Sequence, residues 1–183
     1  MAATEKKNIY PLSAGDGVAP EIVTRRIAAS QGIFMPNAPC YFSTAGTVKL
    51  SDTSDASGDT NHGLIVGVED KSIAWPLTAE LSVNDKVRVL VIRATDRFVC
   101  FAENNGSDSA VATSVVGDQY GLVVSTSAGE IGYTTVDFNE AADVAVQVVG
   151  IYSDLDPETE TTSTSPGRVV VQFLPAVIDA VRA

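Results

Sequence analysis

The sequence predicts an all-β protein, an antiparallel β-barrel or sandwich with an extended N-terminal arm. The first observation is that the chain of 183 residues contains 25 Val and 10 Ile against 9 Leu, and β-branched side chains favour a sheet over a helix. The second is that, from Pro36 onward, short β-branched runs alternate with turn residues, as in antiparallel sandwiches and barrels. The third is an uneven distribution of charge along the chain.

The first 35 residues form the predicted arm. They carry four Lys or Arg residues and three acids, a net charge of +1, whereas residues 36–183 carry eight against twenty, a net charge of −12. Residues 12–20 are rich in small and flexible side chains, which indicates irregular chain. Residues 21–29 follow a proline and fit either one or two helical turns or an extended arm.

Residues 36–183 form the predicted body, a barrel or sandwich of about ten short strands. We expect them near residues 39–44, 46–50, 63–69, 86–94, 97–103, 110–116, 120–126, 130–136, 143–152 and 167–174. Three hairpins are expected, pairing residues 87–93 with 98–101, 121–126 with 131–136, and 144–149 with 169–173. Alternate residues of 87–92 would face opposite sides of the sheet, with both sides at least partly covered.

Two long polar loops, residues 51–62 and 153–167, interrupt the strands and are expected to project into solvent. Their carboxylates are oxygen donors of the kind that calcium prefers. The spacing does not match an EF-hand, so we expect solvated loops and no dedicated metal site. The carboxylates are Asp52, Asp55, Asp59, Asp154, Asp156, Glu158 and Glu160.

Residues with catalytic chemistry are scarce. The single histidine, His62, and two cysteines in different predicted strands cannot supply a Ser/His/Asp triad or the usual zinc ligands. Cys40 and Cys100 lie among aromatic and β-branched neighbours, where a thiol usually acts as a small buried hydrophobe. No phosphate-binding glycine motif and no aromatic-rich carboxylate cluster is present, so we expect no catalytic, cofactor-binding or metal residue and no enzyme.

Charge and hydropathy also limit the partners. A net charge of −11 disfavours direct binding to nucleic acid, which relies on neutralising phosphates. The apolar runs fall far short of the roughly 20 residues that span a bilayer, so we expect no membrane contact. The N-terminus lacks the apolar stretch of a secretory signal, which predicts that the protein is not exported.

Three segments share a pattern of glycines and hydrophobic strand residues: Ala45-Gly-Thr-Val-Lys-Leu50, His62-Gly-Leu-Ile-Val-Gly-Val-Glu69 and Leu81-Ser-Val-Asn-Asp-Lys-Val-Arg-Val89. In this pattern the chain resembles the small β-barrel head decoration, or cement, proteins of tailed bacteriophages. The resemblance is a pattern of glycines and valines over residues 32–103. It implies a non-enzymatic virion protein, made in the host cytoplasm, that binds the capsid exterior and stabilises the head. Its partners would be the major capsid protein and further copies of itself, with a trimer favoured.

In this interpretation the arm contacts the capsid. Its basic residues would lie along an acidic capsid surface, and its apolar residues exceed what a disordered tail needs, so we expect part of the arm to be buried against a partner or a neighbouring copy. The alternative is that these residues pack on their own barrel. The expected contact residues are Lys6, Lys7, Ile22, Val23, Arg25, Arg26, Ile27, Phe34 and Met35, with Trp75 as a buried or interface anchor.

Two other functions stay open at this stage. One is a carbohydrate-binding or receptor-binding β-sandwich whose polar loops form the recognition end. The other is a phage tail or connector component, which also uses β-barrels and extended arms. Clustered exposed aromatic residues would favour the first, and aromatic residues make up 7% of the chain.

Overall fold

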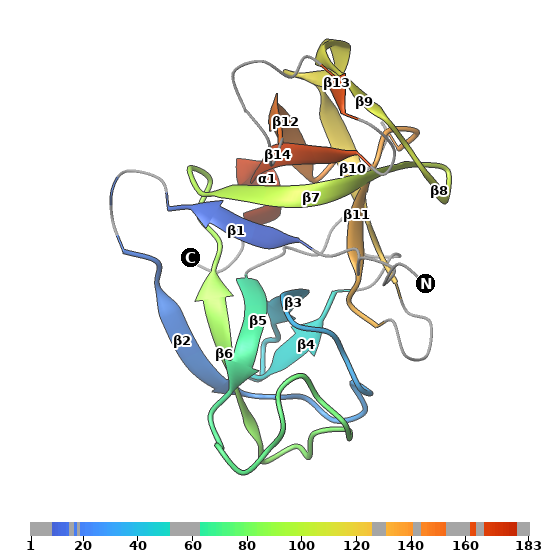
Figure 1. Cartoon of the computed structure of the whole chain (residues 1–183). Helices are drawn as coiled ribbons and strands as arrows, with labels where there is room; N and C mark the ends of the chain where they lie inside the picture. The colour runs from blue at the N-terminus through green and yellow to red at the C-terminus, as the bar shows by residue number, and fades with distance from the viewer. Residues whose placement is uncertain are drawn as a thin grey trace.

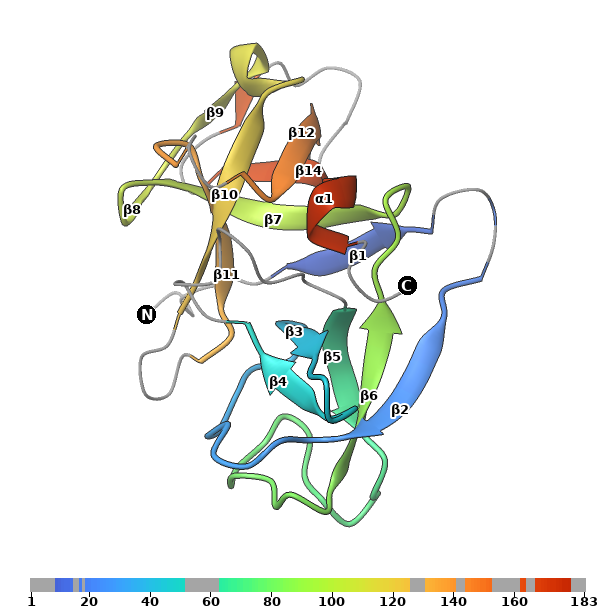
Figure 2. The same cartoon turned by 180° about the vertical axis from the view of Figure 1, so that it is seen from behind.

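The computed structural model has two main β-sheets, one above the other, and a short two-stranded sheet (Figure 1). It describes residues 9–14, 17, 19–51, 63–125, 131–140, 144–152, 162–163 and 167–178. The all-β prediction is confirmed, because these residues form strands joined by turns and loops, and the α-helix among them, α1 (Pro175–Ile178), is one turn long. Seen from behind (Figure 2), α1 lies beside the upper sheet, and its Ile178 packs against the upper core.

Five strands of the upper sheet close into a ring, which we name the upper barrel. The ring runs through β7 (Arg97–Asn104), β11 (Thr134–Asp137), β10 (Gln119–Val124), β12 (Val146–Ile151), β14 (Arg168–Phe173) and back to β7. β1 (Tyr10–Ser13) and β8 (Ser107–Asp108) pair with β7 outside this ring. A separate short pair joins β9 (Val111–Ala112) to β13 (Thr162–Ser163).

The lower sheet is antiparallel and almost closed. Its order is β2 (Ile22–Arg26), β6 (Lys86–Val91), β5 (Gly63–Val68), β3 (Ala38–Phe42) and β4 (Val48–Leu50). The two edge strands meet at one point, where Ile27 forms a bridge to Val48 and the N–H of Ala28 donates to the Val48 carbonyl at 2.8 Å. Beyond that point, β2 and the β3–β4 turn stand apart.

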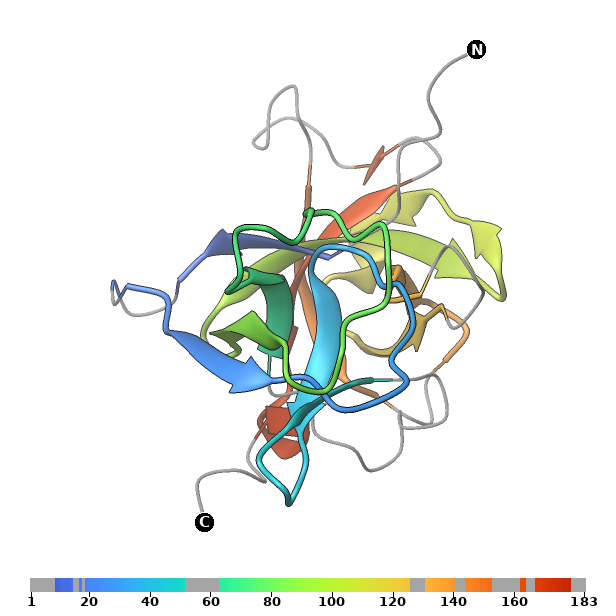
Figure 3. The same ribbon diagram turned by 90° about the horizontal axis from the view of Figure 1, so that it is seen from below.

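Each sheet has its own apolar core. The upper core gathers inward-facing residues of the barrel, and in β14 burial alternates strictly, so that Val169, Val171 and Phe173 point inward. The lower core lies within the lower sheet around Phe34 and Ile65. From below (Figure 3), the loop between β5 and β6 crosses the end of this sheet, and its Leu77 and Leu81 close the lower core.

Strand β6 serves both cores. Val87 and Val89 are buried in the lower core. Leu90, in the same strand, and Ile92, the residue after the strand, belong to the upper core. The prediction that both faces of this segment are covered is therefore confirmed. The chain then crosses from the lower to the upper sheet through a turn in which the Asp96 carboxylate accepts from the Arg93 N–H at 3.0 Å.

That crossing overturns one predicted hairpin. Residues 87–93 and 98–101 do form strands, but β6 pairs with β2 and β5, whereas β7 pairs with strands of the upper sheet. A strand with two apolar faces needs a core on each side, so the Arg93–Asp96 turn directs the chain into the other sheet. The β10–β11 and β12–β14 pairings are confirmed.

Each predicted strand has a counterpart in the structure, and several are shorter than expected. Residues 110–116 contain only β9, followed by a 3₁₀ turn at Thr113–Val115. The strand expected at 130–136 begins at Thr134, because Gly132 has a φ of 88°. That left-handed conformation suits glycine and does not continue a strand. The predicted polar loops fall almost entirely outside the described residues.

The described part of the predicted arm is paired with the rest of the chain. β1 adds to β7, and β2 adds to β6, so both segments are edge strands of the two sheets. Of the two conformations expected for residues 21–29, the extended one is present. In sequence, the whole lower sheet lies between β1 and β7, which are neighbours in the upper sheet.

The two cysteines occupy different cores and are fully buried, as the sequence predicted for small hydrophobes. Burial raises the pKa of both the Cys40 and the Cys100 thiol above its usual value. Because the thiolate is the reactive form, neither cysteine should react with a water-soluble disulfide reagent at pH 8, and both should react in denaturant. Prompt labelling of one thiol in the native protein would show that its core opens readily.

Candidate binding surface

The opening in the lower sheet forms a cleft of about 360 Å³, which we name the basic cleft. Its walls come from β2, the β3–β4 turn and the adjoining ends of β5 and β6. Three lining residues are cationic and one is anionic, the reverse of the chain as a whole, whose net charge is −11. The lining residues are Thr24, Arg25, Arg26, Ala45, Gly46, Thr47, Glu69 and Lys86.

Strand register places two of the cations side by side. Arg26 lies directly opposite Lys86 on neighbouring strands. At the two ends of β2, the Val91 N–H donates to the Glu21 carbonyl and the Ile27 N–H donates to the Asp85 carbonyl. Hydrogen-bonded and non-hydrogen-bonded pairs alternate along antiparallel strands, so Arg26 and Lys86 form a non-hydrogen-bonded pair, in which side chains lie closest. Like charges at such a position repel each other.

One carboxylate relieves part of this repulsion. Glu69 Oε2 lies 2.9 Å from Lys86 Nζ, and both side chains are about half exposed. Among the described residues, no carboxylate lies within ion-pair distance of Arg25 or Arg26. The cleft therefore keeps two uncompensated positive charges that face solvent.

Local turns shape the rest of the cleft. Arg25 Nη1 donates to the Thr24 carbonyl at 3.0 Å, which lays the guanidinium along the outer edge of β2. On the opposite wall, the β3–β4 turn is closed by the Ser43 N–H donating to the Thr47 carbonyl at 2.8 Å. Gly46 in this turn has a φ of 75°, which an L side chain rarely adopts.

Removing the Glu69 charge should make the cleft more attractive to anions. In Glu69→Gln, Lys86 loses its partner, and we expect affinity for a poly-glutamate peptide to rise about twofold or more, with a stability cost below about 1 kcal/mol because the pair is half exposed. Titration followed by fluorescence or calorimetry measures the first effect. Asp118→Asn in the upper sheet is the control for the equal change in net charge, and equal gains in both variants would contradict a local effect.

The predicted arm residues differ in their exposure to solvent. Arg25, Arg26 and Ile22 are exposed on β2, with Ile22 55% exposed, whereas Val23 and Met35 are partly buried. The structure thus brings two of the predicted basic residues into one site. Lys6 and Lys7 lie outside the described residues.

For Ile27 and Phe34 the predicted partner contact is wrong. Their exposed fractions are 1% and 0%, and both pack in the lower core of their own chain. Ile27 reaches the core because it ends the strand at the bridge to Val48, where the sheet turns inward. The alternative weighed from the sequence, packing on their own barrel, holds for these two residues.

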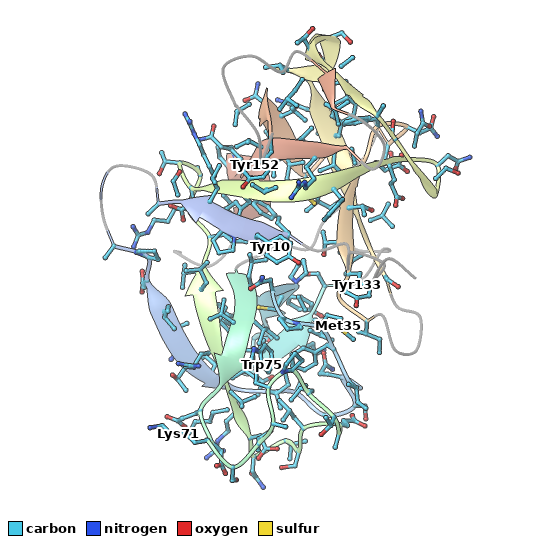
Figure 4. The ribbon with its side chains drawn as sticks, viewed as in Figure 1. Tyr10, Met35, Lys71, Trp75, Tyr133 and Tyr152 are labelled. Atoms are coloured by element: carbon cyan, nitrogen blue, oxygen red, sulfur yellow. The ribbon has the colours of Figure 1, made fainter. Side chains whose placement is uncertain are left out.

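Trp75 lies in the lower half of the molecule and is partly buried (Figure 4). Its ring meets that of Phe34 edge to face, with the ring centroids 6.2 Å apart, and it packs against the lower core. Part of its surface is thus used inside its own chain. Among the described aromatic residues only Tyr10 is exposed, so these residues offer no cluster of exposed rings for stacking a sugar.

The pKa values of Asp70 and Tyr120 are shifted, and neither residue lines the cleft, although Asp70 directly follows Glu69. Hydrogen bonds from the Ser72 N–H and hydroxyl, at 2.8 and 2.7 Å, lower the pKa of Asp70 in an exposed turn. Partial burial and the nearby Asp118 raise the pKa of Tyr120. Within the described part of the chain, no three His, Cys, Asp or Glu side chains are placed to hold a metal ion, and His62 and the loop carboxylates considered for calcium lie outside it.

Comparison with known proteins leaves the basic cleft as the principal clue to function. No protein-family model matches the sequence, and no curated protein shows significant similarity to it. Among the described residues, no helix is long and apolar enough to cross a membrane.

Lys86, Glu69 and the β3–β4 turn were not predicted as site residues. They lie about 20 to 60 positions from Arg25 and Arg26 in the sequence. The pairing of β2 with β6 and the bridge between Ile27 and Val48 bring them together. The Arg25-Arg26 pair was the one local signal in the sequence. Finding the rest required the strand register.

Proposed function

We propose that this chain is a non-enzymatic virion structural protein that binds the outer surface of a bacteriophage capsid and stabilises the head. The basic cleft is the observation that supports this most: an acidic protein presents a small group of cations at the open side of a rigid sheet. Such a group suits contact with an acidic protein surface, because complementary charge fixes register and speeds encounter.

The rest of the molecule is consistent with attachment. The two cores give a rigid scaffold, and the apolar residues exposed on the edge strands β1 and β2 offer further contact area. These are Tyr10, Leu12 and Ile22, each more than 40% exposed. In this proposal several copies, most simply a trimer, sit around a capsid symmetry axis next to the major capsid protein.

Co-sedimentation with empty capsids tests the proposal. The wild-type protein should pellet with capsids and not with isolated tails, and moderate salt should weaken the interaction because exposed charges are screened. In Arg25→Glu/Arg26→Glu, binding should fall at least about tenfold, a loss of roughly 1.4 kcal/mol or more.

The control is Lys71→Glu/Arg97→Glu, which changes the net charge equally at exposed positions outside the cleft. It should bind nearly as well as the wild type. If both variants lost the same capsid affinity, the loss would come from net charge and not from the cleft. Binding of the wild type to tails alone would favour a tail or connector component, and binding to neither would overturn the proposal.

A further inference from the structure

The outer edge of β2 has unused backbone hydrogen-bonding groups. In the ladder with β6, the odd-numbered residues from Glu21 to Ile27 direct their N–H and C=O groups toward β6. The even-numbered residues Ile22, Thr24 and Arg26 therefore direct theirs away from it. Two bonds already lie at this edge: Arg25 Nη1 donates to the Thr24 carbonyl, and the parallel bridge between Ile27 and Val48 occupies the Arg26 carbonyl. Among the described residues, both backbone groups of Ile22 and the N–H groups of Thr24 and Arg26 have no other backbone partner.

The basic cleft lies along this same edge. Ala28 resumes pairing with Val48 where the gap ends, so the unpaired stretch of β2 is bounded on one side by the bridge and faces the Ala45–Thr47 turn. An unpaired strand edge is a ready template for a further strand. At this edge the unpaired strand also carries positive charges, those of Arg25 and Arg26.

We propose that an extended, acidic segment of the partner protein adds to the outer edge of β2 as a further strand. Its backbone pairs with Ile22, Thr24 and the N–H of Arg26. Its carboxylates on one face lie beside Arg26 and Lys86, and a carboxylate on the other face lies beside Arg25, because successive side chains of β2 point to opposite faces. Main-chain bonds supply affinity and the side chains supply specificity in this mode of recognition. The inference rests on the proposed function for the identity of the partner and specifies how that partner is held.

Charge complementarity selects an acidic segment. A carboxylate beside Arg26 would relieve the repulsion between Arg26 and Lys86, which Glu69 offsets only in part. Arg25 would exchange its bond to the Thr24 carbonyl for a carboxylate, because the incoming strand supplies an N–H to that carbonyl. A second copy of this chain meeting edge to edge would place the same cations against each other.

Thr24 offers a matched pair of variants. Thr24→Pro removes an N–H that points away from β6, so the pairing of β2 with β6 keeps its hydrogen bonds, and proline is tolerated at such edge positions. Thr24→Ala removes the side chain and keeps the N–H. We expect Thr24→Pro to weaken capsid binding at least about tenfold and Thr24→Ala to stay within about twofold of the wild type.

Hydrogen exchange of the wild-type protein gives a test that does not depend on a variant folding. With a peptide of alternating Val and Glu as the probe, the amides of Ile22, Thr24 and Arg26 should be protected, while those of Val23 and Arg25, already bonded to β6, should change little. A peptide of alternating Val and Lys is the control and should protect none of them.

The outcomes separate the two proposals. If capsids bind and depend on Arg25 and Arg26, but Thr24→Pro binds like Thr24→Ala and the edge amides stay unprotected, strand addition is overturned and the proposed function stands. If the acidic peptide protects the edge but capsids do not bind, the proposed function fails and the edge site stands. Self-association of Arg25→Glu/Arg26→Glu without loss of peptide binding would show that the arginines only guard the edge, and would overturn the inference.

Discussion

Replacing Phe34 by alanine is expected to destabilise the protein by about 3–5 kcal/mol, the usual range for deleting a fully buried ring. Phe34 has no exposed surface and lies at the centre of the lower core, where its ring meets Trp75. The truncation removes apolar contacts and leaves a cavity that the surrounding strands can close only in part. Among the described residues this is the largest expected effect of a single truncation in the lower sheet.

Denaturant unfolding followed by tryptophan fluorescence measures this loss at a defined place. The chain has one Trp, and Trp75 packs on the lower core, so its emission reports on that core, while far-ultraviolet circular dichroism reports on both sheets. Ile33→Ala is the control, because Ile33 is the neighbouring residue and is 37% exposed; it should cost less than about 1 kcal/mol. Similar losses for both variants would contradict the assignment of Phe34 to the core.

A single added methyl group at Gly63 is expected to cost about 1–3 kcal/mol or more, as overpacking of a filled site does. A Cβ at this position would overlap Val89 Cγ1 and would lie 2.6 Å from the Leu90 carbonyl oxygen. The second contact is with backbone, so it is relieved only if β5 and β6 separate. Because β5 also pairs with β3 at Gly63, the strain extends across three strands.

Gly150→Ala is the matched comparison for Gly63→Ala. Gly150 is also a strand glycine, but its nearest atom to an added Cβ is Val170 Cβ at 3.9 Å, an ordinary contact. Alanine there should be neutral or stabilising by up to about 1 kcal/mol, since it restricts the unfolded chain. The urea midpoint of Gly63→Ala should fall below that of the wild type, and the midpoint of Gly150→Ala should equal or exceed it. Equal midpoints for the two variants would refute the close approach of β5 to β6.

Local patterns predicted the strands well, because alternating burial along a strand produces alternating apolar and polar residues in the sequence. The alternation of Val169, Val171 and Phe173 was sufficient to place β14, and two of the three pairings were found from adjacent runs. The third failed at the crossing from β6 to β7. No local feature distinguishes a turn that returns a strand to its partner from one that sends it to another sheet.

The arm was misjudged because charge and apolar content were interpreted without pairing information. Ile27 and Phe34 have the same character as a docking segment, and only the bridge between Ile27 and Val48 shows that they complete this chain's own core. The site was predicted in part for a related reason. Arg25 and Arg26 are adjacent in sequence, whereas Lys86 joins them through register alone.

The order of the strands along the chain has a consequence for synthesis. Every strand of the lower sheet lies between residues 22 and 91, whereas the upper barrel needs β14, which ends at residue 173. Because the N-terminal parts of a chain leave the ribosome first, the lower sheet can form before the strands that pair with β7 have been synthesised. During that interval the apolar side chains of β7 are exposed, as are the faces of Leu64 and Leu90 that the upper core later buries. A nascent chain stalled shortly before β14 should therefore bind chaperones through β7, and one extended past β14 should release them.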